Sequence, residues 1–73
     1  DEAERLFRRA IELQPENPRT WYELARFEFE SRRRLDEALV YADRSYALDS
    51  WPPDTGTLLN EIRAAIERRS EGA

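Results

Sequence analysis

The chain has 73 residues, of which 38% are charged and 40% hydrophobic, and its formal net charge is -4. A chain of this size buries only about 60% of its unfolded surface, so we expect one small domain with thin layers. The negative charge disfavours general binding to nucleic acid or to anionic membranes, because both require a basic surface. Cysteine and histidine are absent, which excludes disulfides, thiol nucleophiles and nearly every transition-metal site.

Eight aromatic residues argue against a disordered chain, because disordered segments contain few large rings. No apolar stretch approaches the roughly 18 residues that span a bilayer. The first residues are acidic, whereas a signal peptide begins with basic ones. We therefore expect a soluble fragment without a targeting or transmembrane segment.

The first predicted helix covers residues 2–13, because its apolar residues recur at spacings of three and four. These residues are Ala3, Leu6, Phe7, Ala10, Ile11 and Leu13. Pro15 and Pro18 then leave room only for a short turn, since proline cannot continue the hydrogen-bond ladder. Asn17 is the expected N-cap of the next helix.

The second predicted helix runs from Pro18 to Ser31 and has two stripes of large side chains. One stripe is predicted to pack between helices and contains Trp21, Leu24, Ala25 and Phe27. The other contains Tyr22, Arg26 and Phe29. Two stripes indicate two contact surfaces on this helix.

Two further helices follow the arginine-rich turn at residues 31–34. The third is predicted over Leu35–Leu48, and Trp51-Pro52-Pro53 breaks the chain after it. Asp54 or Thr55 is the expected cap of the fourth, whose apolar stripe consists of Leu58, Leu59, Ile62, Ala65 and Ile66. Residues 70–73 are expected to fray.

The chain also repeats itself at an interval of 35 residues. Asp1-Glu2-Ala3 returns as Asp36-Glu37-Ala38, Arg9 returns as Arg44, and Leu13 returns as Leu48. Between the copies lies Trp21-Tyr22-Glu23-Leu24-Ala25, while Ala3, Phe7 and Pro15 match the Ala-x-x-x-Phe and downstream proline spacing of tetratricopeptide repeats. The chain therefore resembles a tetratricopeptide repeat segment.

This resemblance implies an all-α fold of antiparallel helix-turn-helix repeats, with about four helices in a right-handed superhelical stack. Residues 1–73 would form a single fragment. Within it, residues 1–14 would be the second helix of a preceding repeat, residues 18–50 one full repeat, and residues 54–69 a terminal capping helix. The expected class is a non-catalytic scaffold for protein–protein interaction, without cofactor or metal.

The resemblance also implies where a partner would bind, because the first helix of each pair lines the concave groove in this family. The positions in that register are Arg19, Tyr22, Arg26 and Phe29. An aromatic ring beside two guanidinium groups suits a peptide or partner helix, acidic or C-terminal in character. The lysine and asparagine pattern of repeats that bind chaperone tails is not present.

Three alternatives stand beside this interpretation. In the first, Tyr22 and Phe29 simply cover the neighbouring helix while Arg26 pairs with Glu23 or Glu30 at the surface. The chain would instead be a structural spacer, or would form a homodimer, if Leu6, Phe7 and Ile11 remained exposed on the first helix. The run Arg32-Arg33-Arg34 is either a solvated turn or a contact for phosphate or an acidic partner.

Glu28 departs from the family pattern, which places a large aromatic residue at its position. The side chain would reach solvent along its stem, pair with an arginine, or force local repacking around Phe27 and Phe29.

Overall fold

Four α-helices and one π-helical turn make up the secondary structure of residues 2–72, the part of the chain that the computed structural model describes. In order they are α1 (Glu2–Leu13), α2 (Pro18–Phe27), the π turn η1 (Glu28–Arg32), α3 (Leu35–Leu48) and α4 (Pro53–Glu71). These residues contain no strand, so the predicted all-α class is confirmed.

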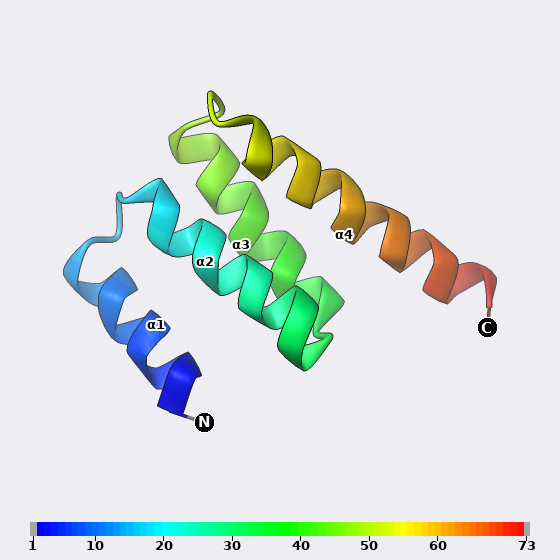
Figure 1. Ribbon diagram of the computed structural model, residues 1–73, viewed down its shortest axis with the longest axis horizontal. Helices are drawn as coiled ribbons and strands as arrows, with labels where there is room; N and C mark the ends of the chain where they lie inside the picture. The colour runs from blue at the N-terminus through cyan, green and yellow to red at the C-terminus, as the bar shows by residue number, and fades with distance from the viewer. Residues whose placement is uncertain (1, 73) are drawn as a thin grey trace.

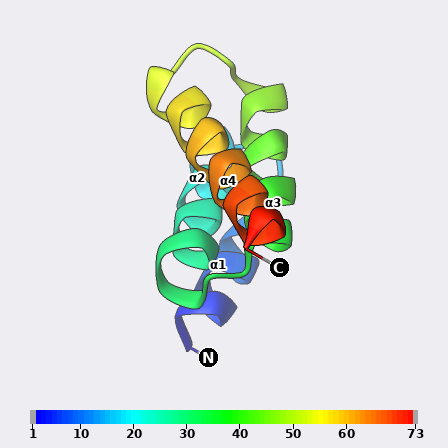
Figure 2. The same ribbon diagram turned by 90° about the vertical axis from the view of Figure 1, so that its right-hand side faces the viewer.

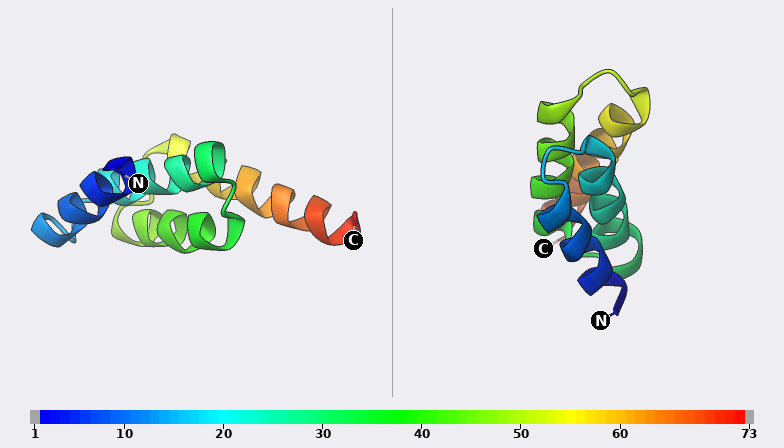
Figure 3. Two further views of the ribbon diagram at one scale, coloured as in Figure 1. Left: turned by 90° about the horizontal axis from the view of Figure 1, so that it is seen from below. Right: turned by 90° about the vertical axis from the view of Figure 1, so that its left-hand side faces the viewer.

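Consecutive helices run in opposite directions and form a thin stack of 39 × 30 × 14 Å (Figure 1). Along the long axis α4 lies in front of α2 and α3 (Figure 2). α2 and α3 lie in two different layers, with α1 at one end of the molecule and the C-terminal half of α4 at the other (Figure 3). α3 packs against both α2 and α4, whereas α1 packs chiefly against α2.

Short polar contacts hold the turn between α1 and α2. The Asn17 side chain accepts a hydrogen bond of 3.0 Å from the backbone N–H of Arg19, so the predicted N-cap is confirmed. The Trp21 indole Nε1 donates to the carbonyl of Pro15 at 2.8 Å, and the Trp21 ring lies 6.0 Å from that of Tyr41 on α3. Trp21 thus links three elements and sets the direction in which α2 leaves the turn.

The second helix departs from α-helical geometry at Glu28, although the sequence predicted one helix as far as Ser31. From Glu28 to Arg32 the chain forms a π turn, which contains more residues than an α turn. Arg33 follows in the left-handed conformation with φ 54°, and the backbone N–H of Arg34 donates to the Glu28 carbonyl at 2.9 Å. The wider turn places an additional residue between the α-helical part of α2 and the start of α3.

The core lies where α2, α3 and α4 meet. At the contact of α2 with α3 it contains Ala25, Ala38 and Ala42, each fully buried. These small side chains let the two helix backbones approach closely. The larger side chains of the core are Phe29, Leu35, Leu58, Leu59 and Ile62, and Ala65 of α4 is buried beside them.

α4 begins and ends differently from the prediction. It starts at Pro53, and no side chain caps it, so neither Asp54 nor Thr55 is the cap. Pro53 fits the first turn because its missing N–H would have no partner there, while Thr55 is buried. The helix includes Ser70 and Glu71, which we had expected to fray, and Ala73 lies outside the described residues. Among the helices of residues 2–72, none is sufficiently long and apolar to cross a membrane.

The packing of α2 makes a test of the core. Leu24 is 1% exposed, so we expect Leu24→Ala to lower the free energy of unfolding by about 2–5 kcal/mol through lost burial and a residual cavity. Leu6→Ala is the matched control, because Leu6 is 65% exposed and should change stability by no more than about 0.5 kcal/mol. Urea denaturation followed by circular dichroism measures both. Equal effects of the two substitutions would contradict the observed packing of α2.

Candidate functional site

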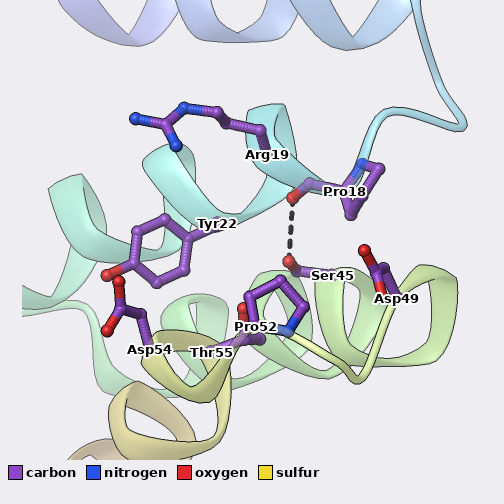
Figure 4. Close-up of a pocket in the computed structure, with 8 residues that line it drawn as sticks. All are labelled: Pro18, Arg19, Tyr22, Ser45, Asp49, Pro52, Asp54 and Thr55. Carbon is purple, nitrogen blue, oxygen red and sulfur yellow. Dashed lines mark hydrogen bonds between the residues drawn. The ribbon is translucent and has the colours of Figure 1, made fainter.

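Two adjoining surface cavities lie between α2 and α4, and both are lined by Tyr22 and Asp54. The first, of about 230 Å³, is drawn in Figure 4 and lies where α2 and α4 begin and α3 ends. The second, of about 210 Å³, continues along the same two helices and is lined also by Arg26, Glu30, Thr57, Leu58 and Glu61. We call the surface formed by the two cavities the α2/α4 groove.

Tyr22 lies at the junction of the two cavities. Its side chain is half-buried and packs against the core, and its hydroxyl end is directed toward Asp54 (Figure 4). Below it the Ser45 hydroxyl donates a hydrogen bond of 2.8 Å to the carbonyl of Pro18. Because Ser45 is buried, this bond fixes the start of α2 to the end of α3 and gives the groove a rigid floor.

Both predicted guanidinium groups have carboxylate partners four residues further along the chain. Arg19 lies 3.4 Å from a carboxylate oxygen of Glu23, and Arg26 lies at the same distance from Glu30. The hydrogen bond to Glu30 raises the pKa of Arg26 above its usual value. In Figure 4 the guanidinium of Arg19 is turned away from Asp54. The pairing of Arg26 at the surface is the arrangement that the sequence left open as an alternative.

Phe29 occupies the core instead of the groove. It lies four residues after the fully buried Ala25, on the same face of the helix, and only 9% of it is exposed. The Arg33 guanidinium lies over its ring at 5.2 Å from the ring centre. The prediction that Phe29 contacts a ligand is therefore corrected: its ring supports α2 from within.

The α4 side of the groove is acidic, which the sequence analysis did not anticipate. Asp54 and Glu61 are exposed, and no ion pair involves either of them within residues 2–72. The sequence pattern indicates only a capping role for Asp54 and no role for Glu61. Their interval of seven residues places them on one face of a helix, but only the packing of α4 shows that this face borders Tyr22.

Comparison with known proteins adds no family to this description. The chain matches no protein-family model, no curated protein and no solved structure. Within the described residues, no group of three acidic side chains is close enough together to hold a metal ion.

Away from the groove, a cluster of charged side chains joins α1 to η1 and to the turn that follows η1. Glu4 on α1 lies 3.2 Å from Arg8, 3.2 Å from Arg32 and 3.5 Å from Arg34. Desolvation opposes the ionisation of Glu4, but these guanidinium groups prevail and lower its pKa. Arg32 and Arg34 therefore help to hold α1 in place, and Arg33 covers the ring of Phe29. The arginine run thus stabilises contacts within the fold, a role that differs from both a solvated turn and a contact for phosphate or an acidic partner.

Glu28 is the buried member of this cluster. It is 1% exposed, its carboxylate oxygens accept no hydrogen bond, and the nearest cation is Arg34 at 3.9 Å. Burial raises the pKa of Glu28, the nearby Glu4 carboxylate raises it further, and Arg34 and Arg32 oppose the shift. Of the three alternatives for Glu28, the side chain does not reach solvent; it pairs loosely with Arg34, and the helix is repacked as a π turn around it.

The raised pKa of Glu28 determines how its contribution to the stability of the fold changes with pH. Between 4.5, the ordinary value for Glu28, and its raised value, the folded state binds more protons than the unfolded state. The contribution of Glu28 to stability therefore decreases as the pH rises through this window, and its full cost is present above the window. At neutral pH the buried carboxylate destabilises the fold.

Replacing the buried carboxylate tests this cost. We expect Glu28→Met to raise the free energy of unfolding at pH 7 by about 1–3 kcal/mol, because a buried charge with a poor partner is replaced by an apolar group of similar volume. The gain should decrease at pH 4.5, where protonation relieves the wild type. Urea denaturation at both pH values measures it, with Glu30→Met as an exposed control. A loss of stability at pH 7, or a gain that does not change with pH, would contradict the assignment.

Proposed function

We propose that the chain is a non-catalytic interaction module that binds a peptide segment or a partner helix along the α2/α4 groove. The observation that carries this proposal is that the two cavities adjoin each other, with Tyr22 and Asp54 lining both. An elongated depression between two helices suits an elongated ligand, because successive side chains can occupy successive hollows.

The size of the groove supports a peptide over a compact small molecule. Pockets for drug-sized ligands and cofactors usually enclose about 300–1,000 Å³. Each cavity here holds about 230 Å³ or less and opens onto the surface. Hollows of this size match single side chains of a peptide better than an enclosed cofactor.

The roles of the binding residues differ from one another in this proposal. Tyr22 offers an apolar ring at the junction of the cavities, with a hydroxyl that can form a hydrogen bond at the rim. Arg19 and Arg26 border the groove and bind partner groups only in competition with Glu23 and Glu30. Phe29 contributes from the core by supporting α2.

A tetratricopeptide-like arrangement is part of the same proposal. Four consecutive antiparallel helices and a groove bordered by alternate helices, α2 and α4, support it. The apolar residues of α4 point into the core, so its outer face is polar. A polar outer face is what a terminal capping helix of a repeat array requires.

Tyr22→Ala tests the groove directly. A random peptide library displayed on phage is selected on the folded wild-type chain, and the affinity of an enriched peptide is then measured by fluorescence anisotropy. We expect Tyr22→Ala to weaken binding about tenfold or more, because the ring contact at the centre of the groove is lost. Tyr46→Ala is the matched control, since Tyr46 is 44% exposed on α3 and does not line the groove.

A second variant separates binding from folding. Thr57 is exposed on the rim of the second cavity, so Thr57→Gln adds bulk over the groove without disturbing the core. Circular dichroism should show unchanged helical content for Thr57→Gln while peptide binding decreases. If no peptide is enriched, or if all variants bind the enriched peptides equally, the groove has no such function.

Self-association is the second candidate function, in which the chain is a structural spacer or forms a homodimer without a peptide ligand. It is favoured by Leu6 and Leu13, which are 65% and 70% exposed and share one face of α1. Phe7 and Ile11 do not add to this face: Phe7 lies 5.4 Å from the ring of Phe27, and Ile11 borders Trp21 and Leu24.

Sedimentation velocity at increasing concentration tests self-association. If the exposed face of α1 drives it, the sedimentation coefficient should increase with concentration for the wild type and remain constant for Leu6→Glu/Leu13→Glu. A coefficient that is constant for the wild type would exclude this function over the concentrations measured.

A further inference from the structure

We infer that the α2/α4 groove selects a basic partner, namely a peptide or helix that presents lysine or arginine side chains to the α4 wall. This inference rests on the proposed function and names the chemical class of the ligand. It departs from the acidic or C-terminal ligand that the sequence suggested, because that expectation required free guanidinium groups in the groove.

The cations of the groove are already compensated. Arg19 lies 3.4 Å from Glu23 on α2, and Arg26 lies 3.4 Å from Glu30 on η1. An acidic ligand would have to displace Glu23 and Glu30 from these pairs. This exchange replaces one exposed ion pair by another, so the net gain in binding free energy is small.

The carboxylates of the opposite wall are not compensated by the protein. Asp54 and Glu61 are exposed, and neither has an ion pair within the described part of the chain. On the side of α4 that faces α3 the arrangement is reversed: Arg63 lies 3.5 Å from Asp43, and Arg69 lies 3.3 Å from Asp36. Two arginines of α4 are thus held toward α3, while two of its carboxylates border the groove.

The geometry of this wall defines what a ligand should present. Asp54 and Glu61 are seven residues apart on α4, which corresponds to about 10.5 Å along a helix axis. A partner helix with basic residues two turns apart matches this interval, and so does an extended peptide with basic residues about three positions apart. Tyr22 lies opposite Asp54. The Arg26 guanidinium lies over its ring at 6.0 Å from the ring centre, so the ring offers apolar contact to the aliphatic stem of such a side chain.

The neighbouring charges favour the same ligand. Asp49 also lines the first cavity and Glu30 the second. The Asp49 carboxylate accepts a hydrogen bond of 3.0 Å from the backbone N–H of Trp51, whereas the charge of Glu30 is offset by its pair with Arg26. A basic ligand is attracted by this potential, whereas an acidic ligand is repelled by it.

Selection from a random 12-residue peptide library tests the inference. The library is displayed on phage and selected in parallel on three proteins: the wild type, Asp54→Asn/Glu61→Gln, and the control Glu16→Gln/Glu67→Gln. The control changes the net charge by the same amount at two exposed positions outside the groove. We expect lysine and arginine to be enriched over aspartate and glutamate on the wild type and on the control, and this enrichment to disappear on Asp54→Asn/Glu61→Gln.

Affinities of one enriched peptide, measured by fluorescence anisotropy, complete the test. We expect about three- to tenfold weaker binding by Asp54→Asn/Glu61→Gln, less than twofold change for the control, and weaker binding as the salt concentration rises. Asp54 lies in the first turn of α4, where its charge also favours the helix. Glu61→Gln alone should therefore still weaken binding about two- to threefold while leaving helical content unchanged.

The outcomes distinguish the ligand class from the function itself. If enriched peptides are neutral or acidic but are lost on Tyr22→Ala, the groove binds peptides and the inference of a basic partner is overturned. If enrichment of basic peptides is equal on all three proteins, general charge attraction explains it, and the inference is likewise overturned. If nothing is enriched, or enrichment does not depend on Tyr22, both the inference and the proposed function fail.

Discussion

The close contact between α2 and α3 is the constraint on which the rest of the structure depends. Ala25 on α2 and Ala38 and Ala42 on α3 are fully buried, and their small side chains let the two helices pack closely, with the rings of Trp21 and Tyr41 6.0 Å apart across them. A contact of this kind buries little area per residue, so the layer must be covered by a neighbour. α4 supplies that cover with Leu58, Leu59 and Ile62. The thin shape of the molecule and the groove beside Tyr22 both follow from this stacking of single helices.

One buried side chain of the stack, Glu28, destabilises the fold at neutral pH. The carboxylate lies in the interior without a hydrogen bond, at the residue where α2 changes to a π turn. An unpaired buried charge costs free energy, and Arg34 at 3.9 Å compensates it only in part. Glu4 brings several guanidinium groups to the same region, so the attachment of α1 rests on electrostatics as well as on the contact of Phe7 with Phe27.

Charge on α4 is divided between its two sides, and this division relates the fold to the proposed function. Arg63 and Arg69 pair with aspartates of α3 and help to hold the helix in place. Asp54 and Glu61 form no ion pair in the described chain and border the groove. The exposed ion pairs of Arg63 and Arg69 contribute little to the free energy of unfolding. The unpaired carboxylates nevertheless make this side of the groove negatively charged, and this charge affects the choice of partner more than the stability of the fold.

Helix positions were predictable from the sequence because they depend on local signals. The spacing of apolar residues, the prolines at positions 15 and 18, and the cap at Asn17 act within one or two turns of the chain. Within the described residues α1, α2 and α3 begin at the predicted residue. The start of α4 is near Pro53 for the same reason, although its expected capping side chain is not used.

Only the tertiary structure decided which side chains share a surface. The sequence placed Phe29 beside Tyr22 and Arg26, but helix packing buries it on the face of Ala25. It grouped two arginines as a site for acidic ligands, yet each pairs with a glutamate four residues further along the chain, and the opposing carboxylates come from α4. Periodicity determines the faces of one helix; which faces meet depends on the angle and rotation at which separate helices pack.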